Sequence, residues 1–373
     1  MSEHDEGPAE VRGGPRAVPA AAGTGGGTGR RIKLADVARE AGVSTASVSR
    51  VLNRHRRVNP EIQSRVHAAV KRLGYHPHSA ARALATRRFD KIGAIVPTLQ
   101  NPAFAAGVEA LQRRLSQEGY ALIVASFNYD PDLELSQARM LASVGVDAMM
   151  LIGVSHRGEL YALLDQSGIP FVNAWAIDRN ARRPCVGFDN RAAAVRLTRY
   201  LLDLGHRDFA VISGVREGND RASERVAGIG DALAERGFEL HPERLIEAPY
   251  QIFESQLALR SLMAMTEPPT AIVCGNDIQA FGALIECQSL GIPVPQSVSV
   301  AGFDDLDFAA HIQPPLTTIQ VPAEEIGERA AEYLLARLAG RATLNLTEIG
   351  TNLLVRSSTG PWSATSRRWQ GTG

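Results

Sequence analysis

Cysteines are scarce in this sequence, and the marks of an exported or membrane-spanning chain are missing. The three cysteines stand at 185, 274 and 287 and form no CxxC pair. Such a scattered, odd set predicts small buried side chains in a reducing compartment, with neither a disulfide framework nor a zinc site. No apolar run reaches the ~18 residues that a membrane span needs, and the first residues are acidic and polar, unlike a secretory signal. We therefore expect a cytoplasmic protein with no metal site and no membrane partner.

Sequence signatures of catalysis are also missing. The chain has no GxSxG elbow, no HExxH and no phosphate-binding loop with its lysine. The glycines of GTGGGTGR do not fit the GxGxxG register, and no strand precedes them. Ser155 and His156 are neighbours in the sequence, which does not make them a hydrogen-bonded pair. We expect no enzymatic activity, no catalytic residue and no cofactor.

The charge of the chain is unevenly distributed. Its 373 residues are enough for two or three domains of ~150 residues, and the 40 basic and 40 acidic side chains balance. Between Arg30 and Arg88, however, fourteen Lys and Arg face three acids, a formal charge of +11 that leaves −11 on the remainder. A small basic module on a larger acidic body predicts a polyanionic partner for the module and another role for the body.

The basic region has the pattern of a helix-turn-helix module. Residues 1–30, rich in glycine, alanine and proline, are expected to be disordered. Apolar residues then recur at helical spacing in three short stretches. Gly42 and Ser44 supply the end of one helix and the N-cap of the next, and Asn59 followed by proline begins the third. We predict a helix-turn-helix DNA-binding domain over 31–77.

The second of these helices, about 45–53, is the candidate for reading DNA. Arg50 can offer a bidentate fork to a guanine edge in a major groove ~12 Å wide, which is worth ~1–3 kcal/mol of discrimination. Short side chains beside it favour apolar contact with a base, and the remainder suit phosphates. The candidate DNA-binding residues of the module are Ser44, Thr45, Ala46, Ser47, Ser49, Arg50, Asn53 and Arg57. The alternative is a solvated charged face on a three-helix scaffold.

Beyond Lys91, short apolar runs alternate with helical stretches. The runs include KIGAIVP, ALIVASF, AMMLIGV, FAVISG and TAIVCGN. Continuous apolar strands separated by helices predict parallel sheets covered on both faces. Because about 270 residues is long for one such sheet, we expect an α/β core of two doubly wound halves that face a cleft. The core is assigned to 89–360 and a flexible tail to 361–373.

Several blocks of the sequence carry a resemblance to a known family. IKLADVAREAGVSTASVSRVLN, VNPEIQSRVHAAVKRLGYHP and SAARAL lie in the basic region, and TAIVCGNDIQAFGALIECQSLGIPVPQSVSVAGFDD lies in the core. Together they resemble the LacI/GalR family of bacterial repressors, and the likeness extends to about residue 356. The resemblance implies a core with the fold of periplasmic sugar-binding proteins. It also implies a hinge helix over 78–88 that orders on operator DNA.

The resemblance gives two hinge residues a role. Leu84 would act as a wedge in the minor groove and bend the duplex, and Ala81 would let the hinge helices of two protomers approach closely. The family usually has asparagine at the hinge cap, where this chain has His78, a poorer cap. The alternative for Leu84 is an ordinary linker leucine.

The resemblance also implies an effector pocket in the core. The candidate effector-binding residues are Phe104, Trp175, Arg225, Tyr250, Asn276 and Asp304. A guanidinium fork with amide and carboxylate groups near the carboxyl ends of strands can satisfy the hydroxyls of a ligand. Loop capping is the alternative for the asparagine and the aspartate, and core packing is the alternative for the aromatic residues.

Three further details of the core are predicted. The resemblance implies that Arg225 lies just before a helix, and Asp277 is interpreted as a structural N-cap of the helix that follows it. The stretches VNAWAID, VGFDN and ECQSLGIPVP look nearest to the gluconate-regulator branch of the family. That likeness suggests a sugar-acid effector whose carboxylate pairs with Arg225.

These observations predict a ligand-responsive transcriptional regulator, most simply a repressor. It would bind a pseudo-palindromic operator in double-stranded DNA as a homodimer, under the control of a small sugar or a sugar acid such as gluconate. Release by an inducer and tightening by a corepressor both fit the sequence. The alternative is a cytosolic sugar-binding sensor without operator specificity.

Overall fold

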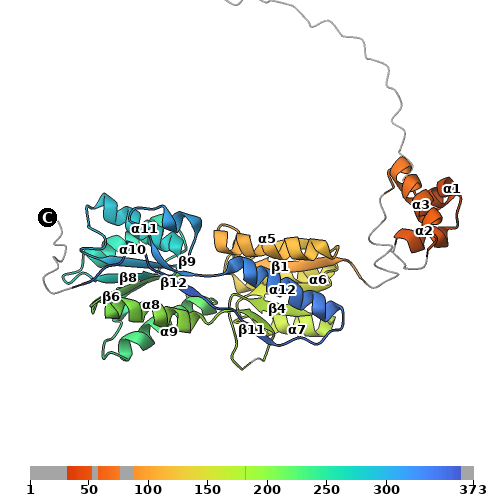
Figure 1. The fold of residues 1–373 in the computed structure, drawn as a ribbon. Helices are drawn as coiled ribbons and strands as arrows, with labels where there is room; N and C mark the ends of the chain where they lie inside the picture. The colour runs from red at the N-terminus through yellow and green to blue at the C-terminus, as the bar shows by residue number, and fades with distance from the viewer. Residues whose placement is uncertain (1–31, 53–57, 76–87, 181, 363–373) are drawn as a thin grey trace, which may run out of the picture. The chain divides into compact units, whose positions relative to one another are not determined.

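The computed structural model describes residues 32–52, 58–75, 88–180 and 182–362 (Figure 1). The chain divides into two compact units, 1–82 and 83–373, which we call the headpiece and the core. Each is described by itself. None of the helices in the described ranges has the length and apolar character to cross a bilayer.

The headpiece contains three short helices around a small apolar centre. They are α1 (Leu34–Ala41), α2 (Thr45–Leu52) and α3 (Pro60–Leu73). Val37, Val48 and Val66, one from each helix, are fully buried and belong to the same apolar cluster. This arrangement confirms the helix-turn-helix fold expected from the sequence.

The turn between α1 and α2 depends on Gly42. Its φ is +60°, the left-handed conformation that glycine adopts without strain. The Arg65 guanidinium of α3 donates hydrogen bonds to the carbonyls of Ala41 (2.6 Å) and Gly42 (3.0 Å) and thereby caps α1. A Cβ on Gly42 would lie 2.4 Å from Arg65 Nη2. The Ser44 hydroxyl then accepts a hydrogen bond from the amide of Ser47, so Ser44 caps α2 as expected.

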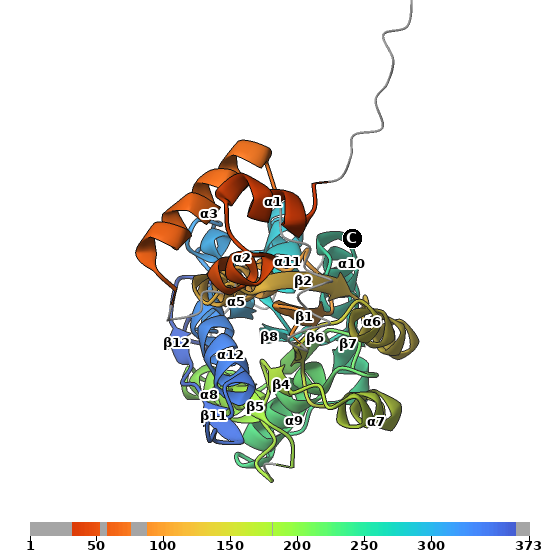
Figure 2. The same cartoon turned by 90° about the vertical axis from the view of Figure 1, so that its right-hand side faces the viewer.

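The amino-terminal half of the core is a six-stranded parallel sheet in the order β11-β5-β4-β3-β1-β2. Its strands are β1 (Lys91–Val96), β2 (Ala121–Ser126), β3 (Ala148–Ile152), β4 (Phe171–Ala174), β5 (Cys185–Gly187) and β11 (Leu346–Glu348). Its helices are α5 (Pro102–Gln117), α6 (Pro131–Ser143), α7 (Gly158–Ser167) and α12 (Ala323–Leu338). Figure 2 shows α5 and α12 on one face of the sheet and α6 and α7 on the other.

The carboxyl-terminal half repeats this architecture with the order β12-β10-β9-β8-β6-β7. Its strands are β6 (Phe209–Ser213), β7 (Leu245–Glu247), β8 (Ala271–Cys274), β9 (Ser299–Asp304), β10 (Thr317–Gln320) and β12 (Asn352–Leu354). Its helices are α8 (Asn190–Asp203), α9 (Asp220–Ala234), α10 (Ile252–Met263) and α11 (Asp277–Ser289), with 3₁₀ turns η1 (Pro242–Arg244) and η2 (Asp307–Ala310). In Figure 1, α10 and α11 lie on one side of the sheet and α8 and α9 on the other. The edge strand β12 pairs antiparallel with β10, and the other pairs are parallel.

The strand orders confirm two doubly wound halves. The chain passes between them after β5, again after β10, and a third time between β11 and β12. Three connections of this kind place the carboxyl ends of the two sets of strands on either side of one cleft, where doubly wound sheets bind ligands. The three cysteines are buried free thiols in these halves, and burial raises the pKa of Cys287 to about 12.

Candidate DNA-binding surface and effector cleft

Helix α2 presents the predicted DNA-reading side chains on its solvent face. Val48 and Val51 are buried, whereas Thr45, Ala46 and Arg50 are exposed. Within the described residues, the structure gives Arg50 neither a hydrogen bond nor an ion pair, so its guanidinium fork is available to a partner. The hydroxyls of Ser44 and Ser47 lie 2.9 Å apart at the amino-terminal end of the helix, and Ser49 is half-buried.

Three other arginines of the headpiece have partners inside it. Arg39 lies 3.3 Å from Asp36, Arg72 lies 3.2 Å from Glu40, and Arg65 caps α1. Arg50 therefore differs from them in that it faces solvent from the helix that follows the turn. Four further candidates, Asn53, Arg57, Ala81 and Leu84, lie outside the described residues, as does the unusual hinge residue His78.

All six predicted effector-binding residues line one small cavity in the cleft. The cavity has a volume of about 20 Å³ and is lined by Asn101, Phe104, Tyr129, Trp175, Arg221, Arg225, Tyr250, Asn276 and Asp304. The first four belong to the amino-terminal half and the other five to the carboxyl-terminal half. An adjoining hollow of about 400 Å³ shares Asn101, Tyr129 and Tyr250 with it. The structure thus brings together side chains that are up to two hundred positions apart in the sequence.

Arg225 lies in the second turn of α9, and the expectation that it precedes a helix was wrong. The helix begins five residues earlier, at Asp220, because Asn219 provides the cap. The Arg225 Nε donates to Asn190 Oδ1 (2.9 Å) and its Nη1 donates to the carbonyl of Gly275 (2.5 Å). The guanidinium also lies over the ring of Phe303, 4.1 Å from the centroid.

Asn276, and not Asp277, is the cap of α11. Its Oδ1 accepts a hydrogen bond from the amide of Gln279 at 3.0 Å. Asp277 is instead the first residue of the helix, where its carboxylate accepts from the Leu306 amide (2.8 Å) and from the Thr318 hydroxyl (2.6 Å). Burial raises the pKa of Asp277 well above its usual range. Asp277 therefore has a structural role, but as a tie between α11, β10 and the loop after β9.

Asp304 ends β9 inside the cavity with a φ of +113°, a conformation rare for any residue but glycine. Its Oδ2 accepts a hydrogen bond from Asn101 Nδ2 across the cleft at 3.3 Å. The distance from Asp304 Oδ1 to Arg225 Nη2 is 3.9 Å, an ion-pair contact without a hydrogen bond. Burial raises the pKa of Asp304, and the nearby Arg225 and the Asn101 hydrogen bond oppose this rise.

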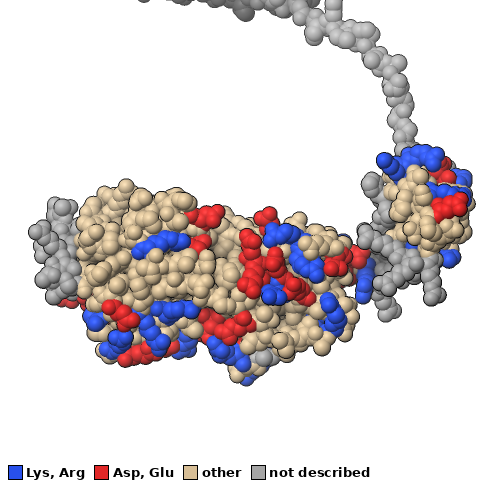
Figure 3. Space-filling model, in the orientation of Figure 1, with Lys and Arg blue, Asp and Glu red and all other residues tan. Residues whose placement is uncertain are grey.

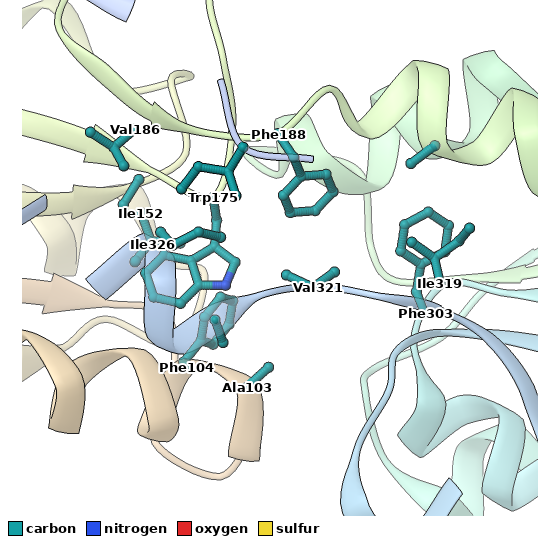
Figure 4. Packing of buried hydrophobic residues seen from close by; sticks show 14 of the residues in the cluster. Ala103, Phe104, Ile152, Trp175, Val186, Phe188, Phe303, Ile319, Val321 and Ile326 are labelled. Carbon is teal, nitrogen blue, oxygen red and sulfur yellow. The ribbon is translucent and has the colours of Figure 1, made fainter. Parts of the chain in front are cut away.

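The aromatic candidates form two pairs. Phe104 and Trp175 are buried in an edge-to-face contact, with ring centroids 5.5 Å apart, in the amino-terminal half (Figure 4). Tyr250 lies 5.7 Å from Tyr129, which belongs to the other half. The first pair lines the cavity, and the second pair lines both the cavity and the larger hollow.

Three lining residues were not predicted from the sequence. Asn101 caps α5 directly after β1, and Tyr129 follows β2 with a φ of +61°. Each stands at the carboxyl end of a strand, and the Asn-Pro cap at 101 repeats the pattern of Asn59, so this signal was present. Arg221 had none, because its place in the cavity depends on where α9 begins.

Ser155 and His156 do not form a catalytic pair in the structure. The buried His156 Nδ1 lies 2.9 Å from Glu134 Oε1, in an orientation that is not aligned for a hydrogen bond, and its Nε2 lies 3.1 Å from the carbonyl of Gly153. Ser155 is exposed. In the parts of the chain that the structure describes, no group of His, Cys, Asp and Glu side chains could hold a metal ion.

Comparison with known proteins agrees with this arrangement. Residues 33–78 match the sequence model of the bacterial regulatory proteins of the lacI family, and residues 89–356 match that of the periplasmic binding proteins and sugar binding domain of the LacI family. The chain belongs to the LacI family. Members of this family are transcriptional regulators, and the family match covers both the headpiece and the core.

Relatives of this LacI-family regulator align over almost its whole length. The HTH-type transcriptional repressors PurR of Pectobacterium atrosepticum and Erwinia tasmaniensis are 33% and 34% identical to it, over 87% of this chain and 96% of theirs. Among solved structures, the regulator CelR in complex with cellobiose is 28% identical, covers 88% of this chain and 100% of its own, and has a TM-score of 0.65. The regulator GntR from Chromobacterium violaceum is 29% identical over 72% of this chain and 99% of its own, with a TM-score of 0.68. A lac repressor dimer bound to operator shares the fold, with a TM-score of 0.79 at 24% identity.

Proposed function

We propose that the protein is a transcriptional repressor that binds a pseudo-palindromic operator as a homodimer and that a small hydroxylated ligand in the cleft controls this binding. The observation that carries the proposal is the union of two sites in one chain. Helix α2 holds Arg50 free on the solvent face of a helix-turn-helix, and nine side chains from both halves of the core surround one cavity. We infer that the ligand is released unchanged and that the protein acts on DNA in the cytoplasm.

The headpiece supplies both kinds of contact that a specific DNA complex needs. Arg50, Thr45 and Ala46 face outward from α2 and suit base edges, and the hydroxyls of Ser44 and Ser47 suit phosphates. A two-fold axis places two such helices about one turn of DNA apart, in successive major grooves. Between them, we assign Leu84 as the minor-groove wedge and Ala81 as the close contact of the hinge pair, as in the family.

An exposed apolar face on the carboxyl-terminal half supports the homodimer. Ile252, Phe253 and Leu257 project from α10, and Phe308 of the turn η2 is also exposed. Ile252 and Phe308 border the same hollow on the surface. A contiguous group of exposed large apolar side chains is typical of a protein interface. We assign this face to an isologous contact with a second copy of the chain.

The cleft supports control by a ligand because its two walls belong to different halves. Asn101 bonds Asp304, and Asn190 Nδ2 of the carboxyl-terminal half donates to the carbonyl of Trp175 at 3.0 Å. A ligand in the cavity touches both walls, so its binding energy favours one relative position of the halves. Operator affinity is then high when the halves take the relative position that lets the two hinges of a dimer meet, and low when they take the other.

The test is operator binding by the full-length protein. A palindrome selected from random duplexes is compared with a scrambled duplex between 50 and 200 mM salt, with and without each of a set of sugars and sugar acids. We expect preference for the palindrome, a loss of ~10³–10⁵-fold in affinity over this salt range if six to ten phosphates are contacted, and a change of palindrome affinity with one ligand. Equal affinity for both duplexes under all of these conditions would overturn the proposal, and conversion of the ligand to a product would favour an enzyme.

A further inference from the structure

The chain passes from the headpiece to the core once, and one carboxylate holds it where it enters. Asp147 Oδ1 accepts a hydrogen bond from the amide of Phe89 at 2.9 Å, and its Oδ2 accepts from the same amide at 3.1 Å and from the amide of Lys91 at 3.3 Å. The Asp147 amide in turn donates to the Lys91 carbonyl at 2.7 Å. Between them, Asp90 has a φ of +53°, a conformation that persists only where its surroundings hold it. Asp147 thus fixes the backbone at the start of β1.

The side chains of Phe89 and Lys91 are held by the turn that leads to Asp147. The Phe89 ring packs over Gly145, where a Cβ would lie 2.5 Å from the ring. Gly145 has a φ of +73°, so this position favours glycine twice over. Lys91 Nζ donates to the carbonyl of Val144 at 3.1 Å and lies 6.0 Å from the centroid of the Phe89 ring. The turn between α6 and β3 therefore contacts both the backbone and the side chains of the entering chain.

Two further elements hold the same segment. Arg88 Nη2 donates to the carbonyl of Leu338, the last residue of α12, at 3.3 Å. The Asp90 carbonyl accepts from the amide of Ala121, the first residue of β2, at 2.9 Å. Residues 88–91 are therefore tied to α12, to β2 and to the turn before β3. The last residue of the hinge segment 78–88 is attached to a fixed point of the amino-terminal half.

Strand β3 connects Asp147 with the cleft. Its five residues directly follow Asp147, are at most 2% exposed, and lie between β1 and β4 in the sheet. At the far end, the Ile152 carbonyl accepts from Arg221 Nη1 at 3.2 Å. The Val154 amide donates to Asp220 Oδ2 at 2.6 Å. A buried strand of five residues spans about 17 Å and yields little, because protein interiors are close-packed. One strand thus contacts the carboxyl-terminal half at one end and the entering chain at the other.

We propose that Asp147 is the positioning residue through which the core holds the hinge segment, and that β3 carries to it the effect of the contacts at the cleft. This inference rests on the proposed function and adds to it a residue at the opposite end of β3 from the cavity. Asp147 acts through the backbone of Phe89 and Lys91. A segment that is ordered before binding loses less conformational entropy on the operator, so these bonds favour operator binding. A shift of the halves displaces Ile152 and Val154 and, through β3, Asp147.

The first experiment measures operator affinity. Asp147→Asn keeps the size of the side chain but offers one acceptor oxygen in place of two, so it cannot hold both amides. We expect the affinity of the full-length protein for its selected palindrome to fall roughly 10-fold or more, as for the loss of a hydrogen bond to a charged group.

Asp178→Asn is the matched control for this loss. Asp178 is also half-buried, and its carboxylate likewise accepts from two backbone amides, at 2.9 and 3.3 Å, but in the loop between β4 and β5. This variant should lose a similar amount of resistance to urea and keep its operator affinity. Equal operator affinities of the two variants would overturn the proposal.

Hydrogen exchange separates positioning from a general structural role. The amides of Phe89 and Lys91 should exchange at least 10-fold faster in Asp147→Asn than in the wild type, while the amides of residues 149–151 in β3 keep their rates. Faster exchange throughout β3 would show that Asp147 stabilises the whole sheet, and it would refute a positioning role. Phe89→Ala is a second variant that keeps the fold, because the ring is 40% exposed. It frees the segment from Gly145 and should also weaken operator binding, and unchanged affinity there counts against the proposal.

A double-mutant cycle tests the link along β3. Asp220→Asn removes the charge that bonds the Val154 amide at the cleft end, and its effect on operator affinity is measured with and without Asp147→Asn. We expect a change of at least about 3-fold with Asp147 present and none without it, which is more than independent sites show. Additive effects, or no effect in either background, overturn the link. Normal operator binding by Asp147→Asn defeats this inference alone, whereas a wild-type protein that prefers no palindrome contradicts the proposed function itself.

Discussion

Asp220 Oδ2 accepts a hydrogen bond from the backbone amide of Val154 at 2.6 Å, and this contact joins the two halves of the core beside the cleft. The same carboxylate pairs with Arg221, which donates to the carbonyl of Ile152 in the first half. Gly153, with a φ of +97°, makes room for this approach, because a Cβ there would lie 2.2 Å from Arg221 Nη1. These contacts of Asp220, Arg221, Ile152 and Val154 form a latch between the two halves, and we expect the latch to favour the closed arrangement of the cleft.

Asp220→Asn should weaken this latch. The carboxylate loses its charge and its charge-assisted hydrogen bond, a change of about 1–2 kcal/mol, so the closed form should lose population. We expect a larger radius of gyration in X-ray scattering without ligand and ligand affinity lowered by roughly 5- to 30-fold. Asp231→Asn, on the same helix but in an exposed pair with Arg191, is the control. Charges of both signs are interspersed over this face of α8 and α9 (Figure 3), so one lost pair there should change little. Identical scattering and affinity for Asp220→Asn would show that the latch does not govern closure.

Arg50→Ala should remove discrimination at one base pair. Because the Arg50 fork faces solvent from α2, its loss should cost ~1–3 kcal/mol at one guanine and little at the other positions. The measurement is operator affinity across a set of single-base substitutions. Arg39→Ala removes the same charge from α1, where Arg39 pairs with Asp36, and should weaken all duplexes slightly and alike. A uniform loss for Arg50→Ala would assign it to phosphate contact instead.

Phe253→Glu should disrupt the homodimer. The side chain is 65% exposed in the single chain. In an isologous contact both protomers would bury the introduced carboxylate, and neither carboxylate would have a partner of opposite charge. We expect the dimer dissociation constant to rise by roughly 100-fold or more in sedimentation velocity, with operator affinity falling in proportion. Leu344→Glu, at a side chain 77% exposed before β11, serves as the comparison and should stay dimeric. A dimeric Phe253→Glu protein would place the interface elsewhere.

His206 should make the core less stable in acid. Burial lowers the pKa of His206 to about 4, while an unfolded histidine has a pKa of ~6.5. Its Nδ1 lies 3.1 Å from the Thr270 hydroxyl and its Nε2 lies 3.1 Å from the carbonyl of Gly360. The neutral ring therefore contributes fully above pH 6.5. As the pH falls from 6.5 to 4, the His206 ring becomes protonated in the unfolded chain but stays largely neutral in the folded one. This difference lowers the free energy of unfolding by about 2–3 kcal/mol at pH 4.5.

Urea unfolding followed by circular dichroism at pH 7.5 and 4.5 checks this dependence. His206→Gln removes the titrating ring, so the difference between the two pH values should shrink by about 2–3 kcal/mol relative to the wild type. The exposed His311 provides the control, since His311→Gln should leave the difference unchanged. An unaltered pH difference in His206→Gln would mean that the acid sensitivity has another origin.

The helix ends show which structural features can be predicted from neighbouring residues alone. Gly42, Ser44 and Asn59 were predicted to end or begin helices and do so, because each of these features needs only a few neighbouring residues. The same local logic failed at the cap of α11. There, the adjacent Asn276 and Asp277 each could serve, and contacts from elsewhere decided between them: Leu306 and Thr318 hold Asp277.

The sequence by itself determined the three-helix headpiece and the two parallel-stranded halves, because helical and strand periodicity and capping act over a few residues. The six effector candidates came from the resemblance of the sequence to the LacI/GalR family. Only the tertiary structure decided which side chains share the cavity. Asn101 meets Asp304 from 203 positions away, and Tyr129 and Arg221 join them because three chain crossings bring the strand ends together. In the described part of the core, the indole Nε1 of Trp175 and the Nδ2 of Asn276 have no hydrogen-bond partner, and this too is invisible in the sequence, since a missing partner is a property of the whole packed environment.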